Sequence, residues 1–150
     1  PDRVARVLGL CTAWKGRGQA GELPALRAMD TAAARRAYRE QVLLRSGLAA
    51  LIAQQGSAAR QRESARLDAW AQEFDAQALC RLRAAAIEFD LGQCPPDTHL
   101  AYASSDTLFP PPNPLPANAS VVSTALGHQS LIYDPGAWRP TIESWITSKT

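Results

Sequence analysis

A long proline-free stretch in the middle of the chain limits the folds open to it. From residue 25 to residue 91 there is no proline and there are only two glycines, while alanine, arginine, leucine and glutamine dominate. These residues favour helix, whereas proline and glycine interrupt it. Because apolar, strand-like segments flank the stretch on both sides, the sequence predicts helices inserted between strands and an α/β fold.

Three short apolar segments are the predicted strands. The first covers roughly residues 4–12, and the other two are residues 99–104 and 120–125. A nearly continuous apolar strand is typical of a parallel sheet that is covered on both faces. Three strands are few for such a sheet, so we expect another chain or segment to complete it.

Capping residues divide the middle stretch into three predicted helices. The candidate caps and stops, in chain order, are Asp30 and Gly56 for the first helix, Ser57 for a second helix through about residue 73, and Asp75 and Gly92 for the third. Asp and Ser accept hydrogen bonds from free N–H groups at a helix start, and glycine ends helices readily. Residues 24–92 are therefore expected to form a helical subdomain, preceded by a core strand and connection in residues 1–23.

The C-terminal part, residues 93–150, returns to strands and ends in a helix. Five prolines between residues 110 and 116 exclude a helix interior there and favour an extended run. A last helix is expected from about Pro140, since proline is tolerated at the first helical position.

Composition excludes several classes of function. Sixteen basic and fourteen acidic residues give a net charge of only +2, which argues against nucleic acid as a partner. No apolar run approaches the roughly 20 residues that span a bilayer, and no export leader opens the chain, so we expect a cytoplasmic protein without membrane partners. The three cysteines contain no C-x-x-C pair, which predicts reduced thiols and no bound metal.

Two residues stand out because each directly follows a predicted strand. Asp106 follows the second strand and His128 the third, 22 residues later. The carboxyl ends of parallel strands share one edge of the sheet, where ligands bind in open α/β folds. A carboxylate that accepts the Nδ1 proton of histidine leaves Nε2 to take a proton from a nucleophile. The spacing therefore predicts a catalytic acid–histidine pair.

Several motifs resemble one family. The segments SSDTLFPP (104–111) and LGHQSLIYD (126–134) resemble the acid loop and histidine loop of α/β-hydrolases, most closely those of the homoserine O-acetyltransferases. EFDAQALCRLRAAAIEFDLG (73–92) is similar to a helix of the same group. PDRVARVLGL (1–10) resembles the strand after the nucleophile's helix. The resemblance implies the C-terminal portion of an α/β-hydrolase fold, with residues 24–92 as its lid.

The resemblance also implies a chemistry. In that family a serine takes an acetyl group from acetyl-CoA and passes it to a hydroxyl, so Asp106 becomes the triad acid and His128 the base. Acetyl-CoA is then a co-substrate and a small hydroxyl compound the acceptor, with no bound cofactor. No Gly-x-Ser-x-Gly occurs in the chain, so the nucleophile is expected on another chain or segment.

Two further residues are candidates for substrate binding. Gln129 stands where the family has an aspartate that helps hold an amino-acid acceptor, which leaves open whether the acceptor is an amino-acid hydroxyl, another alcohol or water. Trp70 is a candidate wall of an acyl channel beneath the lid, and core packing is its alternative role. Two alternative functions of the chain remain besides the transferase: an esterase of the same fold, and a non-catalytic helical module that binds a partner.

Overall fold

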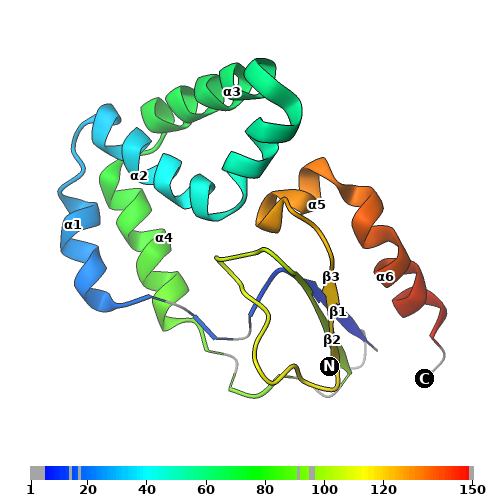
Figure 1. Cartoon of the computed structure of the whole chain (residues 1–150). Helices are drawn as coiled ribbons and strands as arrows, with labels where there is room; N and C mark the ends of the chain where they lie inside the picture. Colours follow the sequence, from blue (N-terminus) through cyan, green and yellow to red (C-terminus); the bar gives the residue numbers. More distant parts are fainter. Residues whose placement is uncertain (1–5, 14, 17, 91, 95–96, 149–150) are drawn as a thin grey trace. The chain divides into compact units, whose positions relative to one another are not determined.

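The computed structural model describes residues 6–13, 15–16, 18–90, 92–94 and 97–148 and shows an α/β protein (Figure 1). Its strands are β1 (Val7–Leu10), β2 (Thr98–Ala103) and β3 (Ala119–Val122). The helices are α1 (Leu23–Arg27), α2 (Ala32–Arg45), α3 (Leu48–Glu73), α4 (Ala76–Glu88), α5 (Ser130–Tyr133) and α6 (Pro135–Thr147), with short 3-10 turns η1 (Ala20–Glu22) and η2 (Gly127–Gln129).

The three strands form a parallel sheet in the order β1-β2-β3. Val7 pairs with Thr98 at one end of β1, and Ala103 pairs with Val122 at the end of β2. The predicted parallel sheet is therefore confirmed. The first strand is shorter than the predicted residues 4–12, and residues 4 and 5 lie outside the described part.

Contacts divide the chain into two compact units that interleave along the sequence. The first unit holds residues 1–13, 45–54 and 93–150, including the sheet, and the second holds residues 14–44 and 55–92. The second unit thus begins before the predicted boundary at residue 24. Residues 45–54 lie within the expected helical subdomain, yet they pack in the sheet unit.

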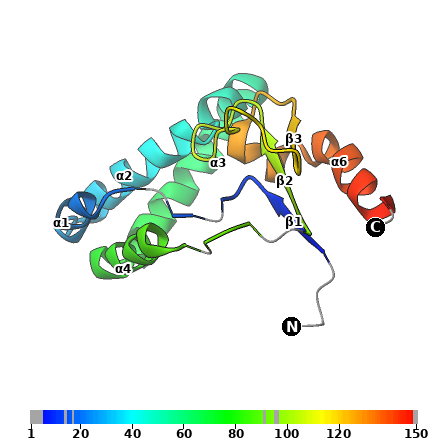
Figure 2. The ribbon, with the colours of Figure 1, turned by 90° about the horizontal axis from the view of Figure 1, so that it is seen from below.

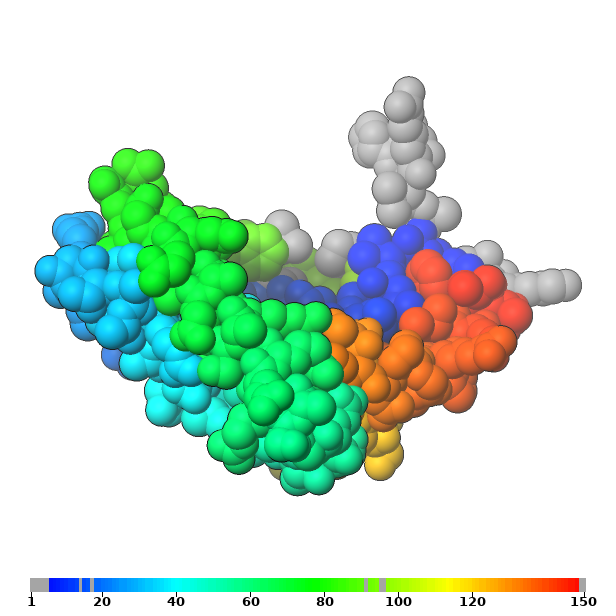
Figure 3. Space-filling view, turned by 90° about the horizontal axis from the view of Figure 1, so that it is seen from above, coloured from blue at the N-terminus to red at the C-terminus, as the bar shows by residue number. Residues whose placement is uncertain are grey.

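The core of the sheet unit lies between the strands and α6. Trp138 of α6 is only 2% exposed and packs in one cluster with Ala101, Ala103 and Val122 of the sheet. Alternate residues of a strand face the same side, so small alanines of β2 leave room for the indole. Figure 3 shows the atoms of α6, in orange to red, beside the blue atoms of the segment that contains β1. There the Arg6 guanidinium lies 4.9 Å from the Trp145 ring centroid.

The last helix begins earlier than the sequence predicts. Pro135 occupies the first helical position, and Pro140 lies inside α6. A proline interrupts the hydrogen bond to the carbonyl four residues before it, here that of Gly136 in the first turn. Only one pairing near the helix start is lost, which explains why the helix continues through Pro140.

The helical unit has a core of its own. Leu26, Leu79 and Cys80 are buried in one cluster, and Trp70 and Tyr38 pack against it. Figure 2 shows α4 extending alongside α1. The predicted cap of α4 is confirmed, since the Asp75 carboxylate accepts a hydrogen bond of 2.6 Å from the Ala78 N–H.

The predicted first helix, from Asp30 to Gly56, is interrupted by a turn. Helix α2 ends at Arg45, and Gly47 has a φ of +108° before α3 begins. The expected break at Gly56 is present, because this residue is non-helical within α3. The cap before α2 is Thr31, whose hydroxyl accepts from the Ala34 N–H at 3.2 Å, and not Asp30.

Across the described ranges, no helix combines the length and the apolar character needed to cross a membrane.

Candidate functional site

The Asp106 side chain is held in a fixed orientation just after β2. Its carboxylate is fully buried, with 0% exposure of the side chain. Oδ1 accepts hydrogen bonds from the backbone N–H groups of Leu108, at 2.8 Å, and Phe109, at 3.1 Å. An aspartate side chain that accepts hydrogen bonds from the N–H groups two and three residues later stabilises a tight turn. Oδ2 is left to point to another partner.

That partner is His128. Its Nδ1 lies 3.0 Å from Asp106 Oδ2, and one third of its side chain is exposed. Asp106 can only accept hydrogen bonds, and its Oδ2 faces the imidazole. The arrangement therefore favours a proton on Nδ1 and an unprotonated Nε2. The Phe109 ring packs 5.5 Å from the imidazole, measured between centroids. The contact expected from the positions of these residues at two strand ends is therefore present.

The electrostatics of the pair favour an ionised carboxylate. Burial raises the pKa of the Asp106 carboxyl. The hydrogen bonds from His128 and from the Phe109 and Leu108 N–H groups together lower this pKa by more than burial raises it. The pKa of Asp106 therefore lies below its usual value. An ionised aspartate at this distance stabilises an imidazolium when His128 takes up a proton.

Neighbouring hydroxyls hold the two loops together. The Ser105 hydroxyl donates to the Thr124 carbonyl at 2.6 Å and accepts from the Gly127 N–H at 3.0 Å. The buried Ser130 hydroxyl donates to the Gly127 carbonyl at 2.6 Å. Gly127 has a φ of +51°, a conformation that glycine adopts without strain. The loop before His128 is thus fixed on both sides by side chains.

The turn between α2 and α3 also supports the histidine loop. The carbonyl of Ser46 accepts from the Gln129 N–H at 3.0 Å, and the Ser46 hydroxyl accepts from Gln129 Nε2 at 2.9 Å. A Cβ at Gly47 would lie 2.0 Å from the Leu126 carbonyl oxygen. Sequence reasoning missed this turn, because nothing in the pattern links residues 46 and 47 to a loop some 80 positions later.

The structure gives the two predicted substrate-binding residues structural contacts. Gln129 is half-buried, and its amide is bonded to Ser46. Trp70 packs on the core of the helical unit and stacks on Phe74 with 5.1 Å between ring centroids. These contacts match the alternative role, core packing, that the sequence left open for Trp70.

Cys11 is a third member of the site that the sequence analysis did not identify. It directly follows β1. Its sulfur atom, a carboxylate oxygen of Asp106 and a ring nitrogen of His128 all lie within 4.8 Å of one another. The sequence placed Cys11 inside the predicted strand of residues 4–12, so no pattern marked it as a residue at a strand end. Burial, followed by the nearby Asp106 charge, raises the pKa of Cys11 to about 12, and only the Ala103 backbone opposes this shift. A thiol in this state is a poor nucleophile at neutral pH.

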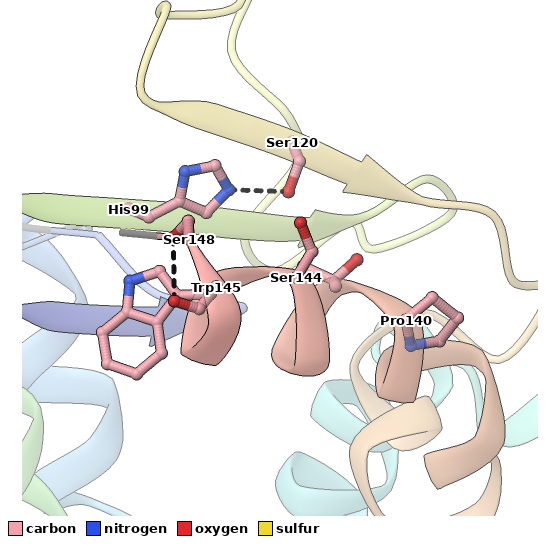
Figure 4. A pocket seen from close by; sticks show the side chains of 7 residues that line it. His99, Ser120, Pro140, Ser144, Trp145 and Ser148 are labelled. Carbon is pink, nitrogen blue, oxygen red and sulfur yellow. Dashed lines mark hydrogen bonds between the residues drawn. The ribbon is translucent and has the colours of Figure 1, made fainter. Parts of the chain in front are cut away.

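A second polar cluster lies nearer the start of the strands, between the sheet and α6. His99 Nε2 is 2.9 Å from the Ser120 hydroxyl, and a cavity of about 440 Å³ adjoins them (Figure 4). Ser144, Trp145 and Ser148 line its other side. No carboxylate among the described residues orients His99, so this pair lacks the acid that Asp106 supplies to His128.

Comparisons with known proteins add no relative. A scan against protein-family models, a search of curated proteins and a search of solved structures each returned no match. The functional interpretation therefore depends on the geometry of the site described above.

Proposed function

We propose that this chain supplies the acid and the base of a serine-type acyl-transfer triad in an α/β-hydrolase fold. The observation that carries the proposal is the 3.0 Å contact between the buried Asp106 carboxylate and His128 Nδ1. Such a carboxylate fixes the tautomer of the histidine, and losing it lowers kcat by about 10⁴-fold in a serine protease. The pair lies at the carboxyl ends of two neighbouring parallel strands, where α/β enzymes place catalytic groups.

Sequence order and topology support the same proposal. Strand β1 is followed by helices before β2, and the acid and histidine loops follow β2 and β3. Lid subdomains are inserted in this way between core strands. In this proposal the helices of residues 24–44 and 55–92 form the lid, other strands extend the sheet beside β1, and the protein works in the cytoplasm.

The proposed reaction is a ping-pong acyl transfer. A serine Oγ of another chain or segment attacks the carbonyl of an acyl thioester such as acetyl-CoA, and His128 Nε2 takes its proton. The C–S bond breaks, and the thiol leaves with that proton. A hydroxyl compound then gives its proton to His128 and attacks the acyl-serine. The ester leaves, and the serine Oγ takes the proton back from His128. With water as acceptor, the same steps hydrolyse the thioester; with an ester as donor as well, they make an esterase.

A labelling experiment tests the proposal. The chain is purified together with the polypeptide that binds it and treated with a fluorophosphonate, and the modified serine is located by mass spectrometry. We expect modification on the co-purifying polypeptide, and a rate at least about 100-fold lower for His128→Ala, since a general base contributes 10²–10⁴-fold. His99→Ala is the matched control and leaves the rate unchanged.

The rival function is a non-catalytic interaction module. It predicts no serine modification and an unchanged partner affinity in His128→Ala. Labelling that is independent of His128 contradicts the proposed triad as well.

A further inference from the structure

We propose that Cys11, Asp106 and His128 together form a binding site for a thiophilic divalent cation such as Zn²⁺. The three side chains follow three neighbouring parallel strands, and one ligand atom from each lies within 4.8 Å of the other two. Thiolate, imidazole and carboxylate are the ligands of protein zinc sites, with bonds of about 2.0–2.3 Å. An ion bound to all three side chains would replace the hydrogen bond between Asp106 Oδ2 and His128 Nδ1.

The carboxylate is already prepared for such a ligand. Asp106 Oδ1 is occupied by the N–H groups of Leu108 and Phe109, so Oδ2, which lies 3.0 Å from His128 Nδ1, is the oxygen that would bind an ion. Backbone donors of this kind orient metal-binding carboxylates and increase their affinity. Partly exposed His128 provides the route of entry, since the other two side chains are buried.

The backbone turns at Cys11, just after β1 ends. Its φ is +45°, a value that is uncommon for a residue with a side chain, although its N–H still extends the sheet by donating to the Ala101 carbonyl at 2.8 Å. Cys11 belongs to the apolar cluster of Trp138, and the proposed catalytic role does not use its thiol, whereas a cation site uses all three residues.

Protons balance in the binding step. The ion displaces the proton of the Cys11 thiol, which leaves to solvent, and forms a bond to the thiolate. The imidazole remains neutral, because its proton moves from Nδ1 to Nε2 while Nδ1 binds the ion. One proton is therefore released for each ion bound, and a fourth position stays open to water.

Occupancy would also regulate the proposed acyl transfer, and this part of the inference rests on the proposed function. With its proton on Nε2, His128 no longer accepts a proton from a nucleophile. Zn²⁺ is thus expected to inhibit, and a chelator to restore activity. Binding itself is measured separately, so a failed transferase assay does not decide the cation site.

Cobalt is the probe for the site. Co²⁺ is titrated into the whole chain with a phosphine reductant, and the absorption spectrum is recorded. We expect a one-to-one complex with a thiolate-to-cobalt charge-transfer band, which Zn²⁺ displaces. The double variant Cys80→Ser, Cys94→Ser is the matched control and keeps the band, since Cys11 is then the only cysteine left.

Two variants test the ligands. Cys11→Ser removes the charge-transfer band, and His128→Gln lowers the affinity for Co²⁺ by about 100-fold or more, since even residues behind the ligands contribute 10–100-fold. His128 is partly exposed, so its variant keeps the fold, which tryptophan fluorescence verifies. Absence of the band in the unaltered chain, persistence of the band in Cys11→Ser, or unchanged affinity in His128→Gln would overturn the proposal.

Discussion

At the level of single residues, the buried Asp106 carboxylate links the stability of the protein to pH. Its pKa is lower in the folded chain than in the unfolded chain, where it is about 3.9. The stabilisation is therefore complete above about pH 4 and is lost as the pH falls through the folded value.

Asp106→Asn tests this linkage. Urea unfolding is measured at a series of pH values from neutral to acidic. At neutral pH we expect a loss of about 1–3 kcal/mol in the free energy of unfolding, because the amide keeps the backbone bonds but loses the charge opposite His128. Below about pH 4 the difference between the two proteins should shrink. A difference in unfolding free energy that stays constant over the whole pH range would contradict the lowered pKa of Asp106.

Cys11 provides a second test at this scale. Cys11 is 3% exposed, and burial raises the pKa of its thiol to about 12, whereas Cys94 is partly exposed. We expect iodoacetamide near pH 8 to alkylate Cys94 in the native chain and Cys11 only after unfolding. Mass spectrometry of the peptides measures both. Rapid native alkylation of Cys11 would show that the site is more open than the structure indicates.

The raised pKa of Cys11 also predicts sensitivity to alkali. Because the folded pKa lies above the usual 9.0, the contribution to stability is complete below that value and is lost as the pH rises from about 9 to about 12. Cys11→Ala should therefore flatten the alkaline decline of the free energy of unfolding, measured in urea. An identical decline in the variant would contradict the pKa.

At the level of elements, the sequence indicated where the site is but not what supports it. The apolar runs of the sequence were enough to place Asp106 and His128. They indicate where the strands end, and the carboxyl ends of parallel strands lie at the same edge of the sheet. The α2–α3 turn at Gly47 was missed because only the close approach of a distant carbonyl requires its glycine. Pro140 misled the prediction of α6, since an earlier proline, Pro135, fills the first helical position.

Gly47→Ala tests the support from the α2–α3 turn. The new methyl group would lie 2.0 Å from the Leu126 carbonyl oxygen, at a φ of +108°. We expect a loss of about 3 kcal/mol or more in the free energy of unfolding, as for other overpacked or strained sites. Gly136→Ala in α6 is the control, since it has nothing within 4 Å, and should change stability by less than about 1 kcal/mol. Equal losses of stability in the two variants would rule out the close approach of Gly47 to the Leu126 carbonyl.

Trp138 is the main apolar anchor of α6. It is 2% exposed, and its Nε1–H donates to the Ser130 hydroxyl at 3.0 Å, two residues after His128. Trp138→Ala should cost about 3–5 kcal/mol of unfolding free energy. Trp138→Phe should cost less, because most of the apolar volume remains. Denaturant unfolding measures both, and an equal cost would mean that packing volume does not determine the stability.

At the level of the whole molecule, the acid–histidine pair is built entirely within one unit. Asp106, His128 and the supporting Ser46 belong to segments far apart in the sequence that fold around the same sheet. The α/β class and the parallel sheet were predictable, because strand and helix patterns alternate clearly along the chain. The division into interleaved units was not, since residues 45–54 have the same helical pattern as their neighbours.

The most direct test of the account is the tautomer of His128. The chain has only two histidines, so ¹⁵N–¹H spectra of histidine-labelled protein contain few signals, and His99→Gln assigns them. We expect a proton on Nδ1 of His128 in the unaltered chain, and we expect it to move to Nε2, or to exchange rapidly between the nitrogens, in Asp106→Asn. A proton on Nε2 in the unaltered chain, or a spectrum unchanged in Asp106→Asn, would contradict it.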